Sequence, residues 1–328
     1  MELELPPLVV TLRGLLALSI LIDIAIGCGP HAKRKQVRVP ETGTEPSPQV
    51  TSPTPPDQVA LPVPITAKET PDLPIEEFDE SSVRLGGQHY YQWDARLKDL
   101  FSPTTSVSQL CWPAALAAEM DYRRSRVASP FNALPEVGSG DHKAPDEIRY
   151  FTRLCETDRD IGTTVIQGVR CIDKHLKASG LAPSIKVSGV DAQWQAFGLF
   201  PSGVTSSDGS IVPEILRHEL QAGTSVLLLI GYYSRNAMSG ALKRERGHFV
   251  AITGFAYRNE WGDERLDLHL MNPAVAPAGT AANDTYEAVE LRKLPASANA
   301  PQDVKYELLG KGFGEGSRMA LIESAVTF

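Results

Sequence analysis

The order of apolar and polar residues divides the chain into a part with helix signals and a later part with strand signals. Four helices are expected, at 114–126, 144–156, 163–180 and 210–223. Residues typical of helix ends support these ranges: Pro113 and Pro145 in first turns, Thr163 or Thr164 and Ser210 as caps, Gly180 and Gly223 as stops. The middle of the chain is therefore predicted to be helical.

After Gly223 the period changes. The segment 224–234 is almost entirely apolar, 247–258 is rich in residues that favour strands, and 265–273 alternates leucines with polar residues. The loop 259–264 between the last two segments predicts a hairpin. Helices followed by strands of a mainly antiparallel sheet indicate an α+β domain.

The first 80 residues have a different composition. Residues 29–80 contain 11 of the 25 prolines and a single aromatic residue, Phe78. Such a segment cannot bury enough apolar surface to offset the entropy lost on ordering, so it is predicted to be a disordered tether. Aromatic residues return after Gln88, and one folded domain is expected over 88–328.

An apolar run at 14–27 precedes this tether. It is shorter than the ~20 residues that span a bilayer, so residues 1–28 are predicted to be a signal peptide. The run ends in Cys28, which resembles the lipidated cysteine of bacterial lipoboxes, although Ala25 stands where that pattern favours Leu. We expect an exported protein, anchored by lipid in a bacterial cell envelope; the alternatives are an uncleaved anchor and an unusual cytosolic N-terminus.

Charge and cysteine spacing exclude two classes of partner. The net charge is −8 and the pI near 5.5, which gives no general attraction to nucleic-acid phosphates. No two cysteines have the C-x2-C spacing of a zinc site, so no structural metal is expected. Two alternatives remain for Cys155 and Cys171, a disulfide in an exported domain or two buried thiols.

Three residues suggest nucleophilic chemistry. Cys111 stands at the expected start of a helix, where the helix dipole lowers the pKa of a thiol. His248 begins one strand of the expected hairpin and Asn272 ends the other, so both lie at one end of the sheet. An amide beside an imidazole can hold it in the orientation that a general base requires. The alternative is a buried structural Cys111 and a histidine that only makes hydrogen bonds.

These segments resemble papain-like cysteine peptidases, in particular the bacterial branch similar to bacteriocin-processing peptidases. The likeness covers about 107–273 and rests on "CWPAALA", "GHFVAITGF" and "MNP" in the family's order. The resemblance implies a helical subdomain carrying the Cys packed on a sheet carrying His and Asn. It also implies that Cys111 attacks a carbonyl, His248 transfers the proton and Asn272 orients His248.

The chain departs from the family at the oxyanion hole. Family members carry a Gln about six residues before the cysteine, and here Thr105 occupies that place. Gln109, two residues before Cys111, is the candidate replacement, together with the Cys111 backbone N–H; a Thr105 or Ser106 hydroxyl is the alternative. The loss of one such donor costs ~10²–10³ in rate, so an incomplete hole would mean a weak or inactive enzyme.

The sequence thus predicts a thiol hydrolase that cleaves a peptide or amide bond of a peptide or protein substrate without a cofactor. One alternative is a deamidase or acyltransferase with the same site. The other is an inactive envelope module that binds peptide. His269 alternates with leucines and is expected to face solvent, and Trp112 is expected in the core.

Overall fold

The computed structural model describes 77–78, 82–84, 90–125, 131, 134–207, 209, 211–236, 238–260, 263–275, 286–295, 298–301, 303–310, 313 and 318–328. The predicted signal peptide, Cys28 and nearly all of the predicted tether lie outside these residues. In the described part of the chain no helix has the length and apolar character needed to cross a membrane.

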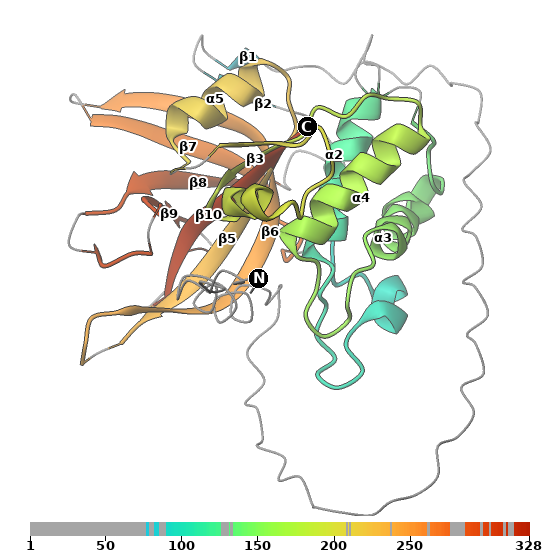
Figure 1. Ribbon diagram of the computed structural model, residues 1–328, viewed down its shortest axis with the longest axis horizontal. Coiled ribbons are helices and arrows are strands. Elements are labelled where there is room, and N and C mark those ends of the chain that lie inside the picture. The colour runs from blue at the N-terminus through green and yellow to red at the C-terminus, as the bar shows by residue number, and fades with distance from the viewer. Residues whose placement is uncertain are drawn as a thin grey trace, which may run out of the picture.

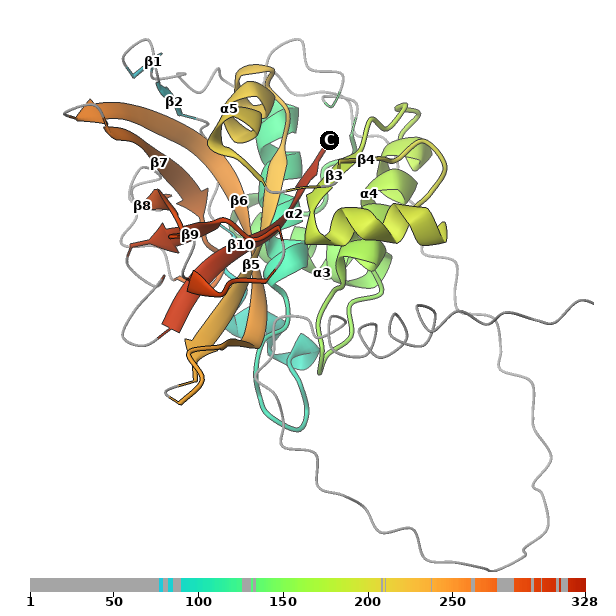
Figure 2. The ribbon, with the colours of Figure 1, turned by 60° about the vertical axis from the view of Figure 1, so that its left-hand side comes forward.

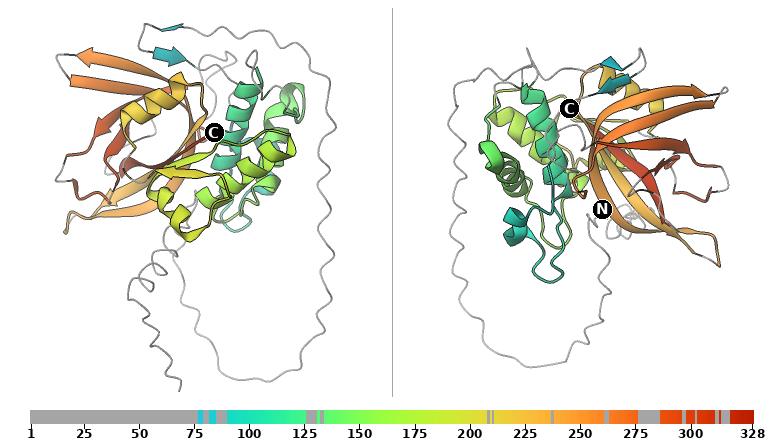
Figure 3. Two further views of the ribbon diagram at one scale, coloured as in Figure 1. Left: turned by 45° about the horizontal axis from the view of Figure 1, so that its top comes forward. Right: turned by 180° about the vertical axis from the view of Figure 1, so that it is seen from behind.

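The structure is α+β, as predicted, with a group of helices beside a large sheet (Figure 1). The helices are α2 (Cys111–Ser125), α3 (Lys143–Leu154), α4 (Val165–Ala178) and α5 (Pro213–Gln221). Short 3-10 helices are η1 (Ala95–Leu100), η3 (Gly140–His142) and η4 (Val190–Phe197). Helix α2 lies next to the sheet, with α3 beside it (Figure 3).

Helix α4 follows its local sequence closely. The Thr164 hydroxyl accepts the Gln167 N–H while the Gln167 side chain accepts the Thr164 N–H, which forms a capping box. Gly180 follows the helix at φ +75°, a conformation that favours glycine. Of the two predicted caps, Thr164 is therefore the one used.

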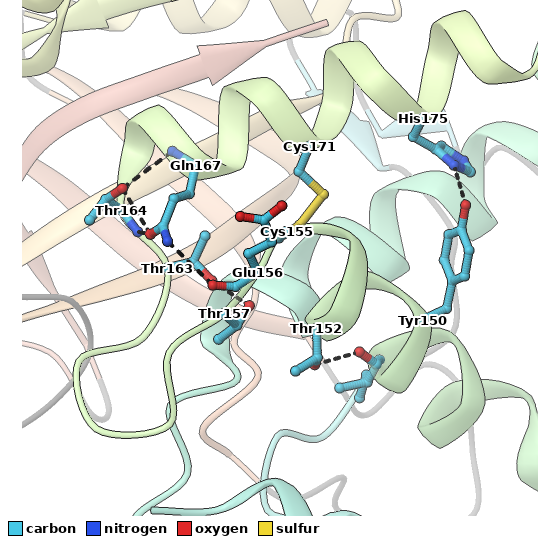
Figure 4. Close-up of a disulfide and its surroundings, with 11 residues drawn as sticks. Tyr150, Thr152, Cys155, Glu156, Thr157, Thr163, Thr164, Gln167, Cys171 and His175 are labelled. Atoms are coloured by element: carbon cyan, nitrogen blue, oxygen red, sulfur yellow. Dashed lines mark hydrogen bonds between the residues drawn. A yellow bond between two sulfur atoms is a disulfide. The ribbon is translucent and has the colours of Figure 1, made fainter. Parts of the chain in front are cut away.

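The disulfide Cys155–Cys171 joins the end of α3 to α4, with a Cα–Cα distance of 4.7 Å (Figure 4). This resolves the two alternatives for these cysteines. The bond closes the connection that carries the chain from one helix to the next, and closing a loop of this length in the unfolded state contributes about 3 kcal/mol of stability.

Ten strands form the sheet in the part of the chain that the structure describes: β1 (Glu77–Phe78), β2 (Ser82–Arg84), β3 (Lys186–Gly189), β4 (Thr205–Ser207), β5 (Val226–Arg235), β6 (Leu242–Glu260), β7 (Asp263–Met271), β8 (Tyr286–Lys293), β9 (Tyr306–Leu309) and β10 (Arg318–Thr327). Strands β5 to β10 pair antiparallel in a closed ring, because β5 bonds to both β10 and β6 (Figure 2). The predicted hairpin of 247–258 with 265–273 is confirmed as β6–β7.

Apolar side chains fill both faces of β5 and β6. One face packs against the helices, and there Trp112 of α2 contacts Phe249 of β6 edge to face, with ring centroids 4.6 Å apart. The other face, with residues such as Ile230 and Val250, forms a second apolar cluster inside the ring of strands. Trp112 is fully buried, as predicted.

Two boundaries differ from the predictions. The predicted cap of α5, Ser210, lies outside the described residues, and Val212 occupies the cap position instead. The helix begins at Pro213 after this extended Val212, because proline sets the helical φ itself and forces its predecessor out of the helical region. Regular structure also begins before Gln88, since β2 pairs with β6 at Val83 and Phe255.

Candidate active site

Cys111 begins α2 and is completely buried. The carbonyl of Leu110 accepts the Ala114 N–H, so Cys111 occupies the first turn of the helix. Backbone N–H groups of a first turn have no partner within their own helix, and the dipole there favours negative charge. In this structure the Cys111 sulfur is part of a disulfide. It can act as a nucleophile only after reduction.

His248 and Asn272 are brought together as the sequence predicts. His248 Nε2 lies 2.7 Å from Asn272 Oδ1, and both side chains are buried. His248 belongs to β6, opposite Ile230 of β5, while Asn272 directly follows the last residue of β7. The pairing of β6 with β7 is therefore what positions the amide against the imidazole.

A second hydrogen bond fixes the proton on this imidazole. The backbone N–H of Ala274 donates to the same Asn272 Oδ1 over 3.1 Å, and an N–H group can only donate. The atom facing His248 is therefore an acceptor, so Nε2 carries the hydrogen and donates. In the neutral ring this leaves the lone pair on Nδ1, the atom that can take a proton from a thiol.

Burial controls the charge of His248. Loss of solvation lowers the pKa of the imidazole to about 4, the hydrogen bond to Asn272 opposes this shift, and the charge of Arg246 adds to it. The ring is thus neutral at pH 7 in this structure, and available as a base.

Backbone and hydroxyl contacts bring the start of α2 to the same end of the sheet. Ser108, three residues before Cys111, donates its hydroxyl to the Gln92 carbonyl over 2.6 Å. The Gln92 N–H in turn donates to the carbonyl of Pro273, next to Asn272, over 2.9 Å. One bridging residue therefore connects the segment before the candidate nucleophile with the segment after the candidate orienting residue.

His248 and Phe249, which are consecutive residues of β6, face opposite sides of the sheet. Phe249 faces α2 through Trp112, so alternation along the strand directs His248 to the other face, where the Tyr232 ring centroid lies 6.5 Å from that of the imidazole. Met271, the last residue of β7, pairs with Ala251. His248 thus lies beyond the end of β7, beside the turn that carries Asn272.

Gln109, the predicted oxyanion donor, is buried but already engaged. Its Nε2 donates to the carbonyl of Asp160 over 3.1 Å, while its Oε1 has no hydrogen-bond partner. Gln92 also buries its side chain, with Oε1 unpartnered, and its backbone makes the bridge just described. Sequence reasoning missed Gln92, because no local pattern marks a residue whose contacts lie 16 positions away and beyond.

Two further histidines lie on α4 and β7. His175 is buried on α4, where Nδ1 lies 3.1 Å from the Tyr150 hydroxyl (Figure 4) and burial lowers the pKa to about 4. His269 is half-buried rather than facing solvent freely, because β7 pairs on both edges. Among the described residues, no group of three or more His, Cys, Asp or Glu side chains is placed to hold a metal ion.

No protein-family model matches the chain, and no curated protein matches it.

Proposed function

We propose that the protein is a papain-like thiol hydrolase that cleaves a peptide or amide bond through an acyl-enzyme on Cys111. The observation that carries the proposal is the His248–Asn272 pair, with the Ala274 N–H fixing the acceptor. That arrangement leaves Nδ1 as the basic atom at the end of the sheet where α2 begins. A general base must be held in one orientation with its basic nitrogen unprotonated, and this pair meets both requirements.

The proposed reaction follows from these roles. The Cys111 thiol gives its proton to His248 Nδ1, and the sulfur attacks the carbonyl carbon of the substrate. His248 then protonates the departing amine as the C–N bond breaks. In the second stage His248 takes a proton from water and the hydroxide attacks the carbonyl carbon of the acyl-enzyme. The C–S bond then breaks, His248 returns the proton to the Cys111 sulfur, and the carboxylic acid product leaves. Asn272 keeps the ring oriented throughout.

The proposed activity has two requirements. Cys111 must be reduced. The His248 imidazole must also contact the Cys111 sulfur around the edge of β6, at the end of that strand where β7 no longer pairs with it. The disulfide Cys155–Cys171 supports the proposal of an exported domain, because such bonds persist in oxidising compartments. Export and lipidation at Cys28 remain proposals from the sequence.

A second function is favoured by the bonded state of Cys111. A protein whose Cys111 stays oxidised has no nucleophile, and the same site would then serve only to bind peptide in the envelope.

Acylation of the protein by p-nitrophenyl acetate separates the two functions. The reduced protein should gain one acetyl group on Cys111 by intact-mass and peptide mapping, and then lose it by hydrolysis. The Cys111→Ala and His248→Ala variants should show no such gain. A reduced wild type that gains no acetyl group would leave the binding function standing.

A further inference from the structure

The loop before Cys111 is held by one acidic residue that lies far away in sequence. Asp160 is in the connection between α3 and α4, and its Oδ1 accepts the hydroxyl of Ser102 over 2.6 Å and that of Thr104 over 3.0 Å. Its backbone carbonyl accepts Gln109 Nε2. Three residues of the segment that leads into Cys111 thus bond to the same residue.

Ser102 organises the rest of this segment. Its Oγ also accepts the N–H groups of Thr104 and Thr105, and its backbone bonds to Val107 and Ser106. Ser106 has φ +55°, which costs energy for a residue with a side chain and persists only where neighbours enforce it. Because Ser102 is buried, its hydroxyl needs the acceptor that Asp160 supplies.

Asp160 is itself held rigidly. The Asp158 carboxylate accepts the N–H groups of Asp160 and Ile161, and backbone bonds between Asp158 and Gly162 close the turn. Below this turn the Thr157 and Thr163 hydroxyls lie 2.8 Å apart, and the disulfide Cys155–Cys171 ties the two helices together (Figure 4). The Asp160 carboxylate therefore lies on a turn that hydrogen bonds and a nearby disulfide hold in place.

We infer that Asp160 is a positioning residue for the proposed reaction: it fixes the segment 102–109 and thereby the backbone N–H of Cys111, the candidate donor to the oxyanion at the start of α2. This inference rests on the proposed function. The Asp160 side chain acts through Ser102 and Thr104 and does not change the basicity of His248. Its loss should thus impair attack on a carbonyl, which generates an oxyanion, and leave attack on a saturated carbon unchanged.

Two reagents distinguish these steps without knowledge of the substrate. In p-nitrophenyl acetate, sulfur bonds to the acetyl carbon through an oxyanion before p-nitrophenolate leaves. In iodoacetamide, sulfur displaces iodide from a saturated carbon and no oxyanion forms. Both rates are measured on full-length protein with Cys111 reduced by a monothiol and the Cys155–Cys171 bond verified by mass.

We expect Asp160→Ala to lower the acetylation rate about 10- to 100-fold, the range that small misplacements of a reacting group produce, and to leave alkylation unchanged. Asp160→Asn keeps an oxygen acceptor and should retain most of the rate. Ser102→Ala should have an effect similar to Asp160→Ala, and the double variant should be little worse than either, because both variants lose the Ser102–Asp160 bond. Arg159→Ala, an exposed neighbour, is the matched control.

The outcomes are separable. A wild type that is alkylated but not acetylated refutes the proposed function, and the inference with it. If the wild type is acetylated and Asp160→Ala is acetylated equally fast, the positioning role alone is refuted. The same holds if Asp160→Ala slows acetylation and alkylation by the same factor.

Discussion

His248 donates Nε2–H to Asn272 Oδ1 at 2.7 Å, and this contact settles which nitrogen of a buried imidazole is basic. The partner oxygen is identified by the Ala274 N–H that it also accepts. The pair is built by two strands that meet in a hairpin, so its geometry depends on the register of β6 and β7.

Changes at Asn272 should move the pKa of His248 in opposite directions. Asn272→Asp keeps the acceptor and adds a negative charge, which favours the imidazolium and should raise the pKa above the value of about 4. Asn272→Ala removes the bond that raises the pKa and should lower it further. Titration of the ring protons by NMR measures both; equal values in the two variants would show that Asn272 does not control the ring.

Gly168 of α4 lies against the indole of Trp112, and the two effects of adding a methyl group compete there. In an exposed helix, Gly→Ala stabilises by about 1 kcal/mol. A Cβ on Gly168 would lie 2.1 Å from a Trp112 ring atom, and Trp112 is held from behind by Phe249. We expect overpacking to win and Gly168→Ala to destabilise the fold by about 1–3 kcal/mol in urea unfolding. A stabilised variant would show that the ring can move aside.

Glu119 should make stability depend on pH. Burial raises the pKa of this fully buried carboxyl from 4.5 to about 7, and one of its oxygens has no hydrogen-bond partner. The folded state then holds a proton that the unfolded state releases, so the contribution of Glu119 is present below pH 4.5 and is lost as pH rises to 7.

Urea unfolding at pH 5 and pH 8 tests this. Relative to the wild type, Glu119→Gln should gain stability at pH 8 compared with pH 5, by about 3 kcal/mol at most. Glu156→Gln, at an exposed carboxyl, is the control and should show no such difference. The lowered pKa values of His175 and His248 make the stability of the fold increase as pH rises from 4 to 6.5, opposite to the effect of Glu119. Both histidines are present in wild type and variant, so their effect cancels in the comparison. A Glu119→Gln variant that follows the wild type at both pH values would contradict a protonated carboxyl.

The features that could be predicted from the sequence are those set by neighbours in the chain. Helix α4 is an example, because the Thr164–Gln167 capping box and Gly180 are local signals. The end of one hairpin likewise places His248 near Asn272. Pro213 shows the limit of such signals, since its own geometry starts α5 and overrides the cap expected from Ser210.

The rest depends on contacts between distant segments. Strand β10 buries Glu323 on a face that would otherwise be apolar. Arg244 of β6, with bonds of 2.7 and 2.8 Å to the carboxylate, and the Tyr233 hydroxyl of β5, with a bond of 2.6 Å, make that burial stable. The roles of Gln92 and Asp160 likewise come from partners in other elements. No periodicity in the sequence could indicate them.

The most direct test of the account is the rate of alkylation of reduced Cys111 by iodoacetamide as a function of pH, in wild type, His248→Ala and Asn272→Ala. A thiol at a helix start with His248 as its partner should react well below pH ~8.5, the pKa of a free cysteine. His248→Ala should move the profile back towards that value. Asn272→Ala should have a smaller effect, because the Asn272 side chain orients the imidazole but carries no charge. A profile that His248→Ala leaves unchanged would contradict the Cys111–His248 pair.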